Sequence, residues 1–345
     1  MDNNIQQLVR KNIKHLASYS SAREEYTGKE GVFLDANENP FGIYNRYPDP
    51  YQYALKQKLS ELKNVSTNQI FIGNGSDEVI DIAFRIFCEP NKDKALTFSP
   101  TYGMYEVSAN INAVELIKLP LNHEFQIDKN RLQPFLSDEN LKLIFICSPN
   151  NPTGNLFHTA DIEYILHNFN GMVLIDEAYI DFCSQPSFIE KTKDYPNLIV
   201  IQTLSKAWGL AGIRLGIAFM NETVLAYYNK VKAPYNVSAI NQRIALDTLN
   251  KEVEYRQRVE EIMTEKEKLK ERLKQLDCIR KIYPSDANFL LIEVDDANKL
   301  YHKLIEQKII IRNRDSVVKN CVRITIGTPQ ENEKLLNTLK EISNG

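Results

Sequence analysis

LSKAWGLAGIRLG, at residues 204–216, is the stretch that decides how the fold is interpreted, because it directly follows a short run of apolar residues. Most lysines are simply surface residues. Here, however, Lys206 follows a hydroxyl side chain, Ser205, and precedes Arg214 by eight residues. Lysine forms Schiff bases with aldehydes in desolvated, cationic sites, and serine and arginine both bind phosphate. The stretch therefore favours a reactive lysine beside a phosphate-binding arginine at the end of a buried strand.

Short apolar runs alternate with longer helical patterns around this stretch. The expected strands lie at 95–98, 143–147, 173–176, 198–202 and 215–220, and the expected helices at 77–88, 102–110 and 159–168. Runs rich in Val, Ile, Leu or Phe and bounded by turn-forming residues are typical of buried parallel strands. The alternation predicts an α/β fold with a mostly parallel central sheet and helices on both faces. Ligands of such sheets bind beyond the carboxyl ends of the strands.

The pattern changes after Pro234. Residues 236–276 predict long helical material, whose alternating charges favour a solvated helix face over a coiled coil or a basic recognition helix. Strands at 288–294 and 322–326 and helices at 297–307 and 331–342 are expected to follow. We therefore expect an N-terminal arm (1–30), a large α/β domain (31–235) and a small α+β domain (236–345).

Composition disfavours several classes of protein. The 345 residues are 43% hydrophobic and 25% charged with a net charge of −3, which is typical of a globular protein without a nucleic-acid partner. None of the five cysteines forms a CxxC pair, so we expect neither a metal site nor a disulfide framework. Because we find neither a run of about 18 apolar residues nor a secretory-signal pattern, we expect a cytoplasmic protein with no membrane partner.

An aspartate, Asp176, closes the apolar run at 173–176. A buried carboxylate is costly unless a cation pairs with it, and a protonated pyridine ring is one such cation. The alternative is that Asp176 only caps a helix. Tyr179 follows three residues later and could offer its phenol to the same ligand.

Three other loops follow expected strands or precede an expected helix. Asn151 lies between two prolines in SPNNPTG, a rigid turn that can present its amide. Gly75, Ser76 and Asp77 begin an apolar helix, whose free N–H groups can bind phosphate. This loop matches neither a dinucleotide-binding pattern nor a Walker A pattern. Tyr102, in PTYGMY, could stack on a flat heterocycle or simply be a packed aromatic residue.

Two arginines, Arg312 and Arg323, lie next to or within apolar strand patterns. Each needs an anion, which is either a substrate carboxylate or phosphate, or an Asp or Glu in a structural salt bridge. Two arginines that converge on one anion favour a phosphate monoester over a carboxylate, because the phosphate carries nearly two charges and three oxygens.

In their order along the chain these residues resemble the fold-type-I, class-II pyridoxal-phosphate-dependent aminotransferases, and most closely the histidinol-phosphate aminotransferase branch. The resemblance covers essentially the whole chain. It rests on YSSAR (19–23), LDANENPFG (34–42), RYPDP (46–50), SPNNPTG (148–154) and SKAWGLAGIRLG (205–216). Trp208 stands where the family more often has phenylalanine.

The resemblance implies pyridoxal 5'-phosphate as the cofactor and Lys206 as the lysine that binds it and moves protons. It also implies that Asp176 faces the pyridine nitrogen, that Asn151 and Tyr179 face the 3-oxygen, and that Tyr102 stacks on the ring. The other residues implied are Gly75, Ser76, Asp77, Ser205, Arg214 and Tyr47 of the partner subunit for the cofactor, and Tyr19, Asn37, Arg312 and Arg323 for the substrate. The implied assembly is a homodimer with shared active sites.

The expected activity is the transfer of an amino group between glutamate and imidazole-acetol phosphate, which yields histidinol phosphate for histidine biosynthesis. Alternatives of the same fold are an aromatic amino-acid aminotransferase and a threonine-phosphate decarboxylase. A non-catalytic cofactor-binding regulator is disfavoured, because about 30 residues before the core are too few for a helix-turn-helix module and a linker. A nicotinamide dehydrogenase is disfavoured by the missing dinucleotide fingerprint.

Overall fold

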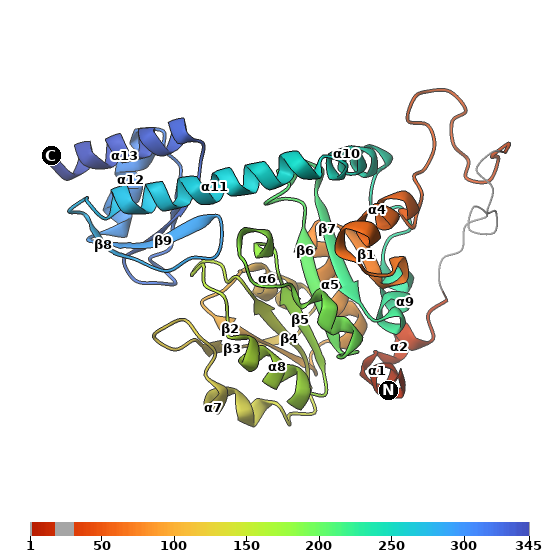
Figure 1. The fold of residues 1–345 in the computed structure, drawn as a ribbon. Coiled ribbons are helices and arrows are strands. Elements are labelled where there is room, and N and C mark those ends of the chain that lie inside the picture. The colour runs from red at the N-terminus through yellow and green to blue at the C-terminus, as the bar shows by residue number, and fades with distance from the viewer. Residues whose placement is uncertain (1, 18–30, 345) are drawn as a thin grey trace.

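Two β-sheets organise the chain, one large and one small (Figure 1). The computed structural model describes residues 2–17 and 31–344. The strands of the large sheet are β1 (Ile70–Asn74), β2 (Lys94–Ser99), β3 (Glu115–Pro120), β4 (Leu141–Cys147), β5 (Met172–Asp176), β6 (Leu198–Thr203) and β7 (Leu215–Met220). They lie in the order β1-β7-β6-β5-β4-β2-β3, and β7 runs antiparallel to both of its neighbours while the other pairs are parallel.

The mostly parallel α/β fold expected from the sequence is confirmed. The five expected strands form β2 and β4 to β7. The two outermost strands, β1 and β3, were not expected. Only three apolar residues of β1 precede its Gly-Asn end, and β3 lies at the sheet edge with mostly exposed or half-buried side chains, so neither gives a clear buried-strand pattern.

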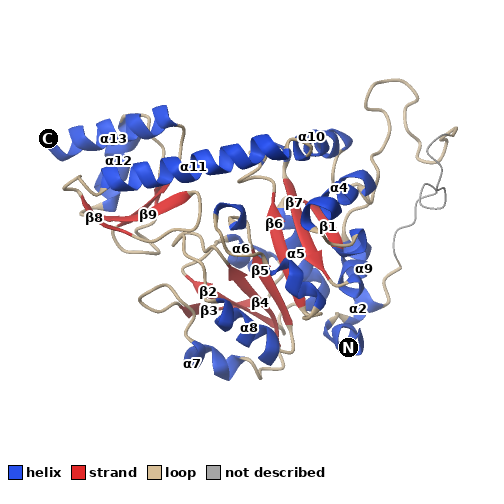
Figure 2. Cartoon of the chain, in the orientation of Figure 1, coloured by secondary structure: helices blue, strands red, loops and turns tan. Residues whose placement is uncertain are grey.

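Helices cover both faces of the large sheet (Figure 2). One face packs against α4 (Tyr53–Lys63), α7 (Lys129–Leu132), α8 (Thr159–Asn168) and α10 (Ala239–Leu249). The other packs against α1 (Asp2–Leu8), α2 (Lys11–Lys14), α5 (Ser76–Phe87), α6 (Met104–Ile111) and α9 (Glu222–Val231). Short 3-10 helices are η1 (Thr67–Gln69), η2 (Gln133–Phe135), η3 (Ile180–Phe182), η4 (Phe188–Lys193) and η5 (Ala211–Ile213).

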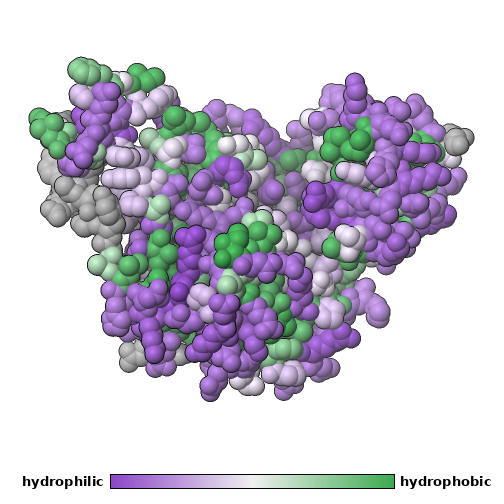
Figure 3. Space-filling model, turned by 180° about the vertical axis from the view of Figure 1, so that it is seen from behind, coloured by the Kyte–Doolittle hydropathy of each residue, from purple (hydrophilic) through white to green (hydrophobic). Residues whose placement is uncertain are grey.

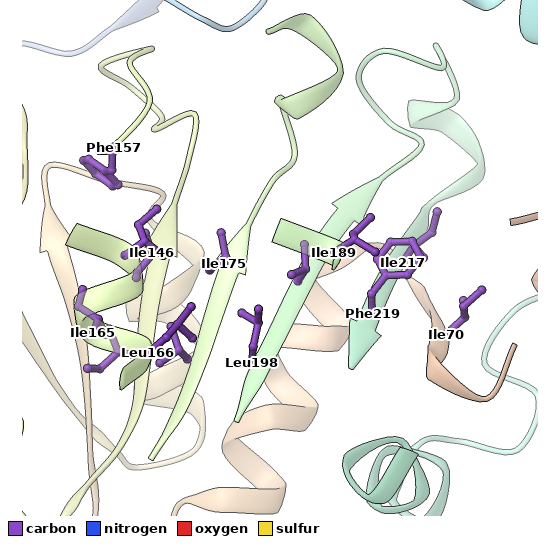
Figure 4. Close-up of a cluster of buried hydrophobic side chains, with 14 of the residues drawn as sticks. Ile70, Ile146, Phe157, Ile165, Leu166, Ile175, Ile189, Leu198, Ile217 and Phe219 are labelled. Atoms are coloured by element: carbon purple, nitrogen blue, oxygen red, sulfur yellow. The ribbon is translucent and has the colours of Figure 1, made fainter. Parts of the chain in front are cut away.

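The apolar core follows from the two-residue period of the strands. In β4, Ile144 and Ile146 face the first helix layer, whereas Phe145 and Cys147 face the second. Figure 4 shows Ile146 in the first layer, gathered with apolar side chains of neighbouring strands and of α8. Burial on both faces explains why these strands read as continuous apolar runs.

The small sheet is antiparallel, and its strands lie in the order β10-β11-β9-β8. Its elements are β8 (Ile279–Ile282), β9 (Phe289–Val294), β10 (Arg312–Asn313), β11 (Cys321–Thr325), α12 (Ala297–Glu306) and α13 (Pro329–Asn344). The expected strands at 288–294 and 322–326 correspond to β9 and β11, whereas β8 and β10 are short and were not expected. The domain limits expected at residues 31 and 236 remain a prediction.

Helix α11 (Glu252–Leu273) runs from α10 beside the large sheet to the small sheet (Figure 1). Its buried residues are Glu265, Lys266, Leu269 and Leu273, all in its second half. The remainder of this charged helix is exposed or half-buried, as the solvated-face interpretation predicted. No helix in the described ranges is long and apolar enough to cross a membrane.

The strand register brings the ends of several strands to one edge of the large sheet. Asp176 at the end of β5 lies beside Cys147 at the end of β4. Thr203 at the end of β6 lies beside Gly216, near the start of the reversed strand β7. The segments that follow β1, β4, β5 and β6 therefore meet at this edge, where open α/β sheets bind their ligands.

Candidate active site

A cavity of about 520 Å³ opens at this edge of the large sheet, and β10 and β11 contribute to its wall. The residues expected from the sequence that line it are Ser76, Asp77, Tyr102, Asn151, Asp176, Tyr179, Ser205, Lys206, Arg214, Arg312 and Arg323. Residues far apart in the sequence thus share one space. Gly75 does not line the cavity itself, but it lies next to the guanidinium of Arg214.

Asp176 is buried within the wall of the cavity, with 3% of its surface exposed. Its Oδ2 accepts a hydrogen bond of 2.8 Å from the hydroxyl of Tyr105, and its Oδ1 accepts one of 3.0 Å from the backbone N–H of Ala178. Burial raises the pKa of Asp176 to about 6, although these hydrogen bonds oppose the rise. Asp176 is not the N-cap of any described helix, so the capping interpretation fails. A cation in the cavity would stabilise its charged form.

Lys206 follows β6, and its side chain is partly exposed to the cavity. Its Nζ lies 5.8 Å from the centroid of the Tyr179 ring and has no hydrogen-bond or ion-pair partner among the described residues. Partial desolvation lowers the pKa of Lys206, and the charge of Arg323 lowers it further. Both effects favour the neutral amine, which is the form that attacks aldehydes and accepts protons.

Asn151 connects two groups of the cavity. Its Nδ2 donates a hydrogen bond of 3.5 Å to the hydroxyl of Tyr179, and its Oδ1 accepts one from Nη1 of Arg323. Asn151 and Tyr179 are both buried. The two side chains thus present an amide and a phenol side by side, and Arg323 lies against them.

Backbone and side chains form a cradle at the start of α5. Gly75 has φ = +83°, and a Cβ there would lie 2.7 Å from Nη2 of Arg214. At Gly216 a Cβ would lie 2.2 Å from the backbone nitrogen of Ser76, so only glycine allows this approach. The first N–H groups of a helix have no partner within it, and here Arg214 lies beside them. A helix start, a serine and an arginine make a phosphate-binding arrangement.

Asp77 holds two residues of this cradle together. Its Oδ1 accepts a hydrogen bond of 3.0 Å from the hydroxyl of Tyr102, and its Oδ2 lies 3.5 Å from Nη2 of Arg214. In the structure Asp77 therefore orients the tyrosine and the arginine. Tyr102 also meets the ring of Tyr105 edge-on, so it packs against its neighbour and borders the cavity at the same time.

The two expected arginines of the small sheet reach the cavity together. Arg312 pairs directly with Arg323 across β10 and β11, so both side chains lie on one face. Among the residues that the structure describes, neither has a carboxylate within ion-pair distance. The salt-bridge interpretation therefore fails, and both arginines remain available to a ligand.

Two of the expected residues that the structure describes, Asn37 and Tyr47, lie away from this cavity. Asn37 and Tyr47 line a second hollow, together with Ser238 and Ile240, and the Tyr47 ring stacks on Tyr235 with centroids 4.4 Å apart. Within one chain the structure does not bring them to Lys206. Tyr19 lies outside the described residues.

A model of the class I and II aminotransferases matches residues 25–339. The chain belongs to this family. A histidinol-phosphate aminotransferase of Parabacteroides distasonis is 51% identical over 98% of this chain and 99% of its own length. The resemblance read from the sequence motifs is thereby confirmed.

Solved structures agree with this membership. The histidinol-phosphate aminotransferase from Clostridium acetobutylicum has a TM-score of 0.80 at 25% identity, over 90% of this chain and 98% of that one. That of Sinorhizobium meliloti, in complex with pyridoxal-5'-phosphate, has a TM-score of 0.80 at 23% identity, over 90% of each chain, and supports the fold alone.

Tyr105 and Arg314 belong to the candidate site but were not expected from the sequence. Tyr105 is fully buried, three residues after Tyr102, and its hydroxyl bonds Asp176. A tyrosine within an apolar helix pattern needs a partner for its hydroxyl, which was the available signal. Arg314 lines the cavity two residues after Arg312, and the two-residue period of a strand could have placed both on one face.

Proposed function

We propose that this chain is a pyridoxal-phosphate-dependent enzyme that transfers an amino group between glutamate and imidazole-acetol phosphate. Its products in that direction are 2-oxoglutarate and histidinol phosphate, and the step belongs to histidine biosynthesis. One observation carries the proposal: a single cavity holds Lys206, the buried Asp176, and Arg312 and Arg323, which have no carboxylate partner among the described residues. The 51% identical relative, named a histidinol-phosphate aminotransferase, supports the choice of substrate.

The residues present fit pyridoxal phosphate. The cofactor's phosphate would meet the start of α5, Ser205 and Arg214, where Gly216 leaves no space for a side chain and keeps the backbone close. Asp176 would face the pyridine nitrogen, because its buried carboxylate has no cationic partner within bonding distance in the described chain. Asn151 and Tyr179 together would hold the 3-oxygen.

When bound, pyridoxal phosphate supplies an aldehyde that condenses with amines and a protonated ring that accepts an electron pair. The protein's own residues bind the substrate and transfer its proton. Lys206, whose lowered pKa favours the neutral amine, takes the proton from the substrate's α-carbon and returns it. Asp176 would favour the protonated ring by holding a negative charge beside it. Arg323 anchors the anionic group of each substrate in turn, and its bond to Asn151 fixes its position.

Steady-state assays test the choice of substrate. Glutamate should be paired in turn with imidazole-acetol phosphate, phenylpyruvate and 4-hydroxyphenylpyruvate, and kcat/KM measured for each. We expect imidazole-acetol phosphate to be preferred by at least roughly 10-fold, because its phosphate forms more charge-assisted hydrogen bonds with the arginines than the carboxylate of either aromatic acceptor does. If phenylpyruvate were the far better acceptor, an aromatic amino-acid aminotransferase would replace our assignment.

We further propose that the enzyme is a cytoplasmic homodimer with shared active sites. Large apolar side chains are exposed on the projecting segment that begins at residue 31, namely Val32, Leu34, Phe41 and Ile43. This segment projects from the molecule (Figure 1), and apolar surface gathers there (upper left of Figure 3). Such surface is typical of an interface. In a dimer this segment could carry Tyr47 to the partner's cofactor phosphate. The five cysteines are all unpaired, which suits a reducing compartment.

A complementation experiment tests the shared site. Mixing inactive Lys206→Ala with a Tyr47→Ala variant should restore activity, since a hybrid dimer then carries one intact site. Random subunit exchange should give about a quarter of wild-type activity. As a control, Lys206→Ala mixed with Asp176→Ala should recover nothing, because both residues line the same chain's cavity. No recovery with Tyr47→Ala, despite proven exchange, would remove Tyr47 from the shared site.

A further inference from the structure

Arg314 is a fourth arginine of the cavity wall, besides Arg214, Arg312 and Arg323, and neither the proposed mechanism nor the motifs use it. It directly follows β10, and its backbone N–H donates a hydrogen bond to the carbonyl of Cys321. The strand pairing therefore continues to this residue. Because Arg312 and Arg314 are two residues apart on a strand, their side chains lie on the same face as that of Arg323.

The guanidinium of Arg314 makes no hydrogen bond or ion pair with any residue in the ranges 2–17 and 31–344. Its side chain is half-buried, and its Nε is buried without any hydrogen-bond acceptor, as is the Nε of Arg323. No carboxylate of the described chain lies within ion-pair distance of it. A buried donor left unsatisfied costs free energy, so this arrangement indicates a ligand that supplies acceptor oxygens.

Electrostatics point to the same conclusion. Burial lowers the pKa of Arg314 to about 10, and the charges of Arg323 and Arg312 add to that lowering. Three like charges on one sheet face repel each other, and no described carboxylate lies within ion-pair distance of any of the three. A dianion bound among them would relieve the repulsion better than a singly charged group.

The three arginines on this sheet face, Arg312, Arg314 and Arg323, are not equivalent. Of the three, Arg323 contributes most to the lowered pKa of Lys206, and its guanidinium donates a hydrogen bond to Asn151. Arg314 is not among the largest causes of the lowered pKa of Lys206. A carboxylate has two oxygens, which one arginine can satisfy in a bidentate pair. A phosphate monoester has a third oxygen and nearly a second charge, which leaves a place for a further guanidinium.

We propose that Arg314 is a specificity-determining residue that binds the phosphate of the substrate alongside Arg312 and Arg323, and so favours the phosphate-bearing substrate over glutamate. The proposal rests on the function proposed above and deepens it. Arg323 serves both substrates, whereas Arg314 serves the phosphate alone.

Single-turnover kinetics of the two half-reactions test this. In Arg314→Gln holoenzyme the half-reaction with histidinol phosphate should slow roughly 10- to 100-fold at limiting substrate, because charge-assisted hydrogen bonds are lost. The half-reaction with glutamate should slow less than about 3-fold, since its carboxylate keeps Arg323. Arg314→Lys keeps the charge but not the planar fork, so it should fall between Arg314→Gln and wild type. If the glutamine variant does not fold, Arg314→Lys tests the same role.

Two results would overturn the proposal. Equal slowing of both half-reactions would mean that Arg314 only supports the structure of the cavity. A larger effect with glutamate would mean that Arg314 binds that substrate's second carboxylate. The matched control is Arg280→Gln, an exposed arginine paired with Asp295 outside the cavity, and both half-reactions should remain unchanged.

A second measurement separates this inference from the proposed function. Inorganic phosphate should compete with glutamate for the wild-type holoenzyme, and more weakly in Arg314→Gln. This competition needs no turnover of histidinol phosphate. Unchanged competition would overturn the role of Arg314 whatever the wild-type enzyme does with histidinol phosphate. Failure of the wild type to accept histidinol phosphate would instead overturn the proposed function.

Discussion

Replacing Lys206 with alanine is expected to reduce turnover roughly 10⁴-fold, because the side chain both holds the cofactor and moves the substrate's proton. The structure supports this role with an amine that faces the cavity, has no bonding partner in the described chain and has a lowered pKa. Lys193→Ala is the control, since Lys193 is exposed at the end of η4 and outside the cavity. It should keep normal turnover.

Chemical labelling locates the reactive lysine independently of turnover. Borohydride should attach the cofactor permanently to one peptide of the wild-type protein, and mass spectrometry should place it on Lys206. In Lys206→Ala the attachment should be absent. A label on Lys230 or Lys232, which lie in or just after α9, would contradict the assignment.

Replacing Asp176 with alanine is expected to reduce kcat roughly 10³-fold while the fold is retained, because the charge that keeps the pyridine ring protonated is lost. Asp176→Asn should be nearly as inactive, since it keeps the size of the side chain but not its charge. The buried position matters here. With no cation beside it, Asp176 begins to take up a proton as the pH falls towards its raised pKa of about 6. A bound cationic ring should lower that pKa again.

The neighbouring carboxylate provides a matched control. Glu177 is buried like Asp176, but it accepts hydrogen bonds from Ser187, Phe188 and Gln202 and does not line the cavity. Glu177→Gln should therefore keep kcat within about 3-fold of wild type, because it is not aimed at the reacting groups. Near-normal turnover of Asp176→Ala would rule out its role at the ring. The cofactor's absorbance, followed against pH, should shift only in the Asp176 variants.

Much of the architecture could be read from local patterns. The buried strands β4 to β7 were expected because burial on both faces gives each of them an unbroken apolar run. The weaker strands were not predicted. Strand β10 has only two residues, too few to show an alternating pattern, and β3 lies at the sheet edge with mostly exposed or half-buried side chains. The order of the strands in the sheet could not be predicted from the sequence pattern either, because it depends on which surfaces pack together.

Family membership, and the prediction that Lys206 is the reactive lysine, followed from residues that are neighbours in the sequence, such as those at 204–216. Their spacing predicts a chemical role without knowledge of the packing. A strand end, a lysine and an arginine within one short loop are held near one another by the chain itself.

The tertiary structure alone decided which distant side chains meet. The hydroxyl of Tyr105 reaches Asp176 across 71 positions of the sequence, and Arg323 reaches Asn151 across 172. It also put Arg314 into the cavity, and among the described residues it left Asp176 without a helix to cap and Arg323 without a carboxylate partner. The physical reason is that such contacts depend on strand register and on how the small sheet packs over the large one, and neither is encoded in the periodicity of any single segment.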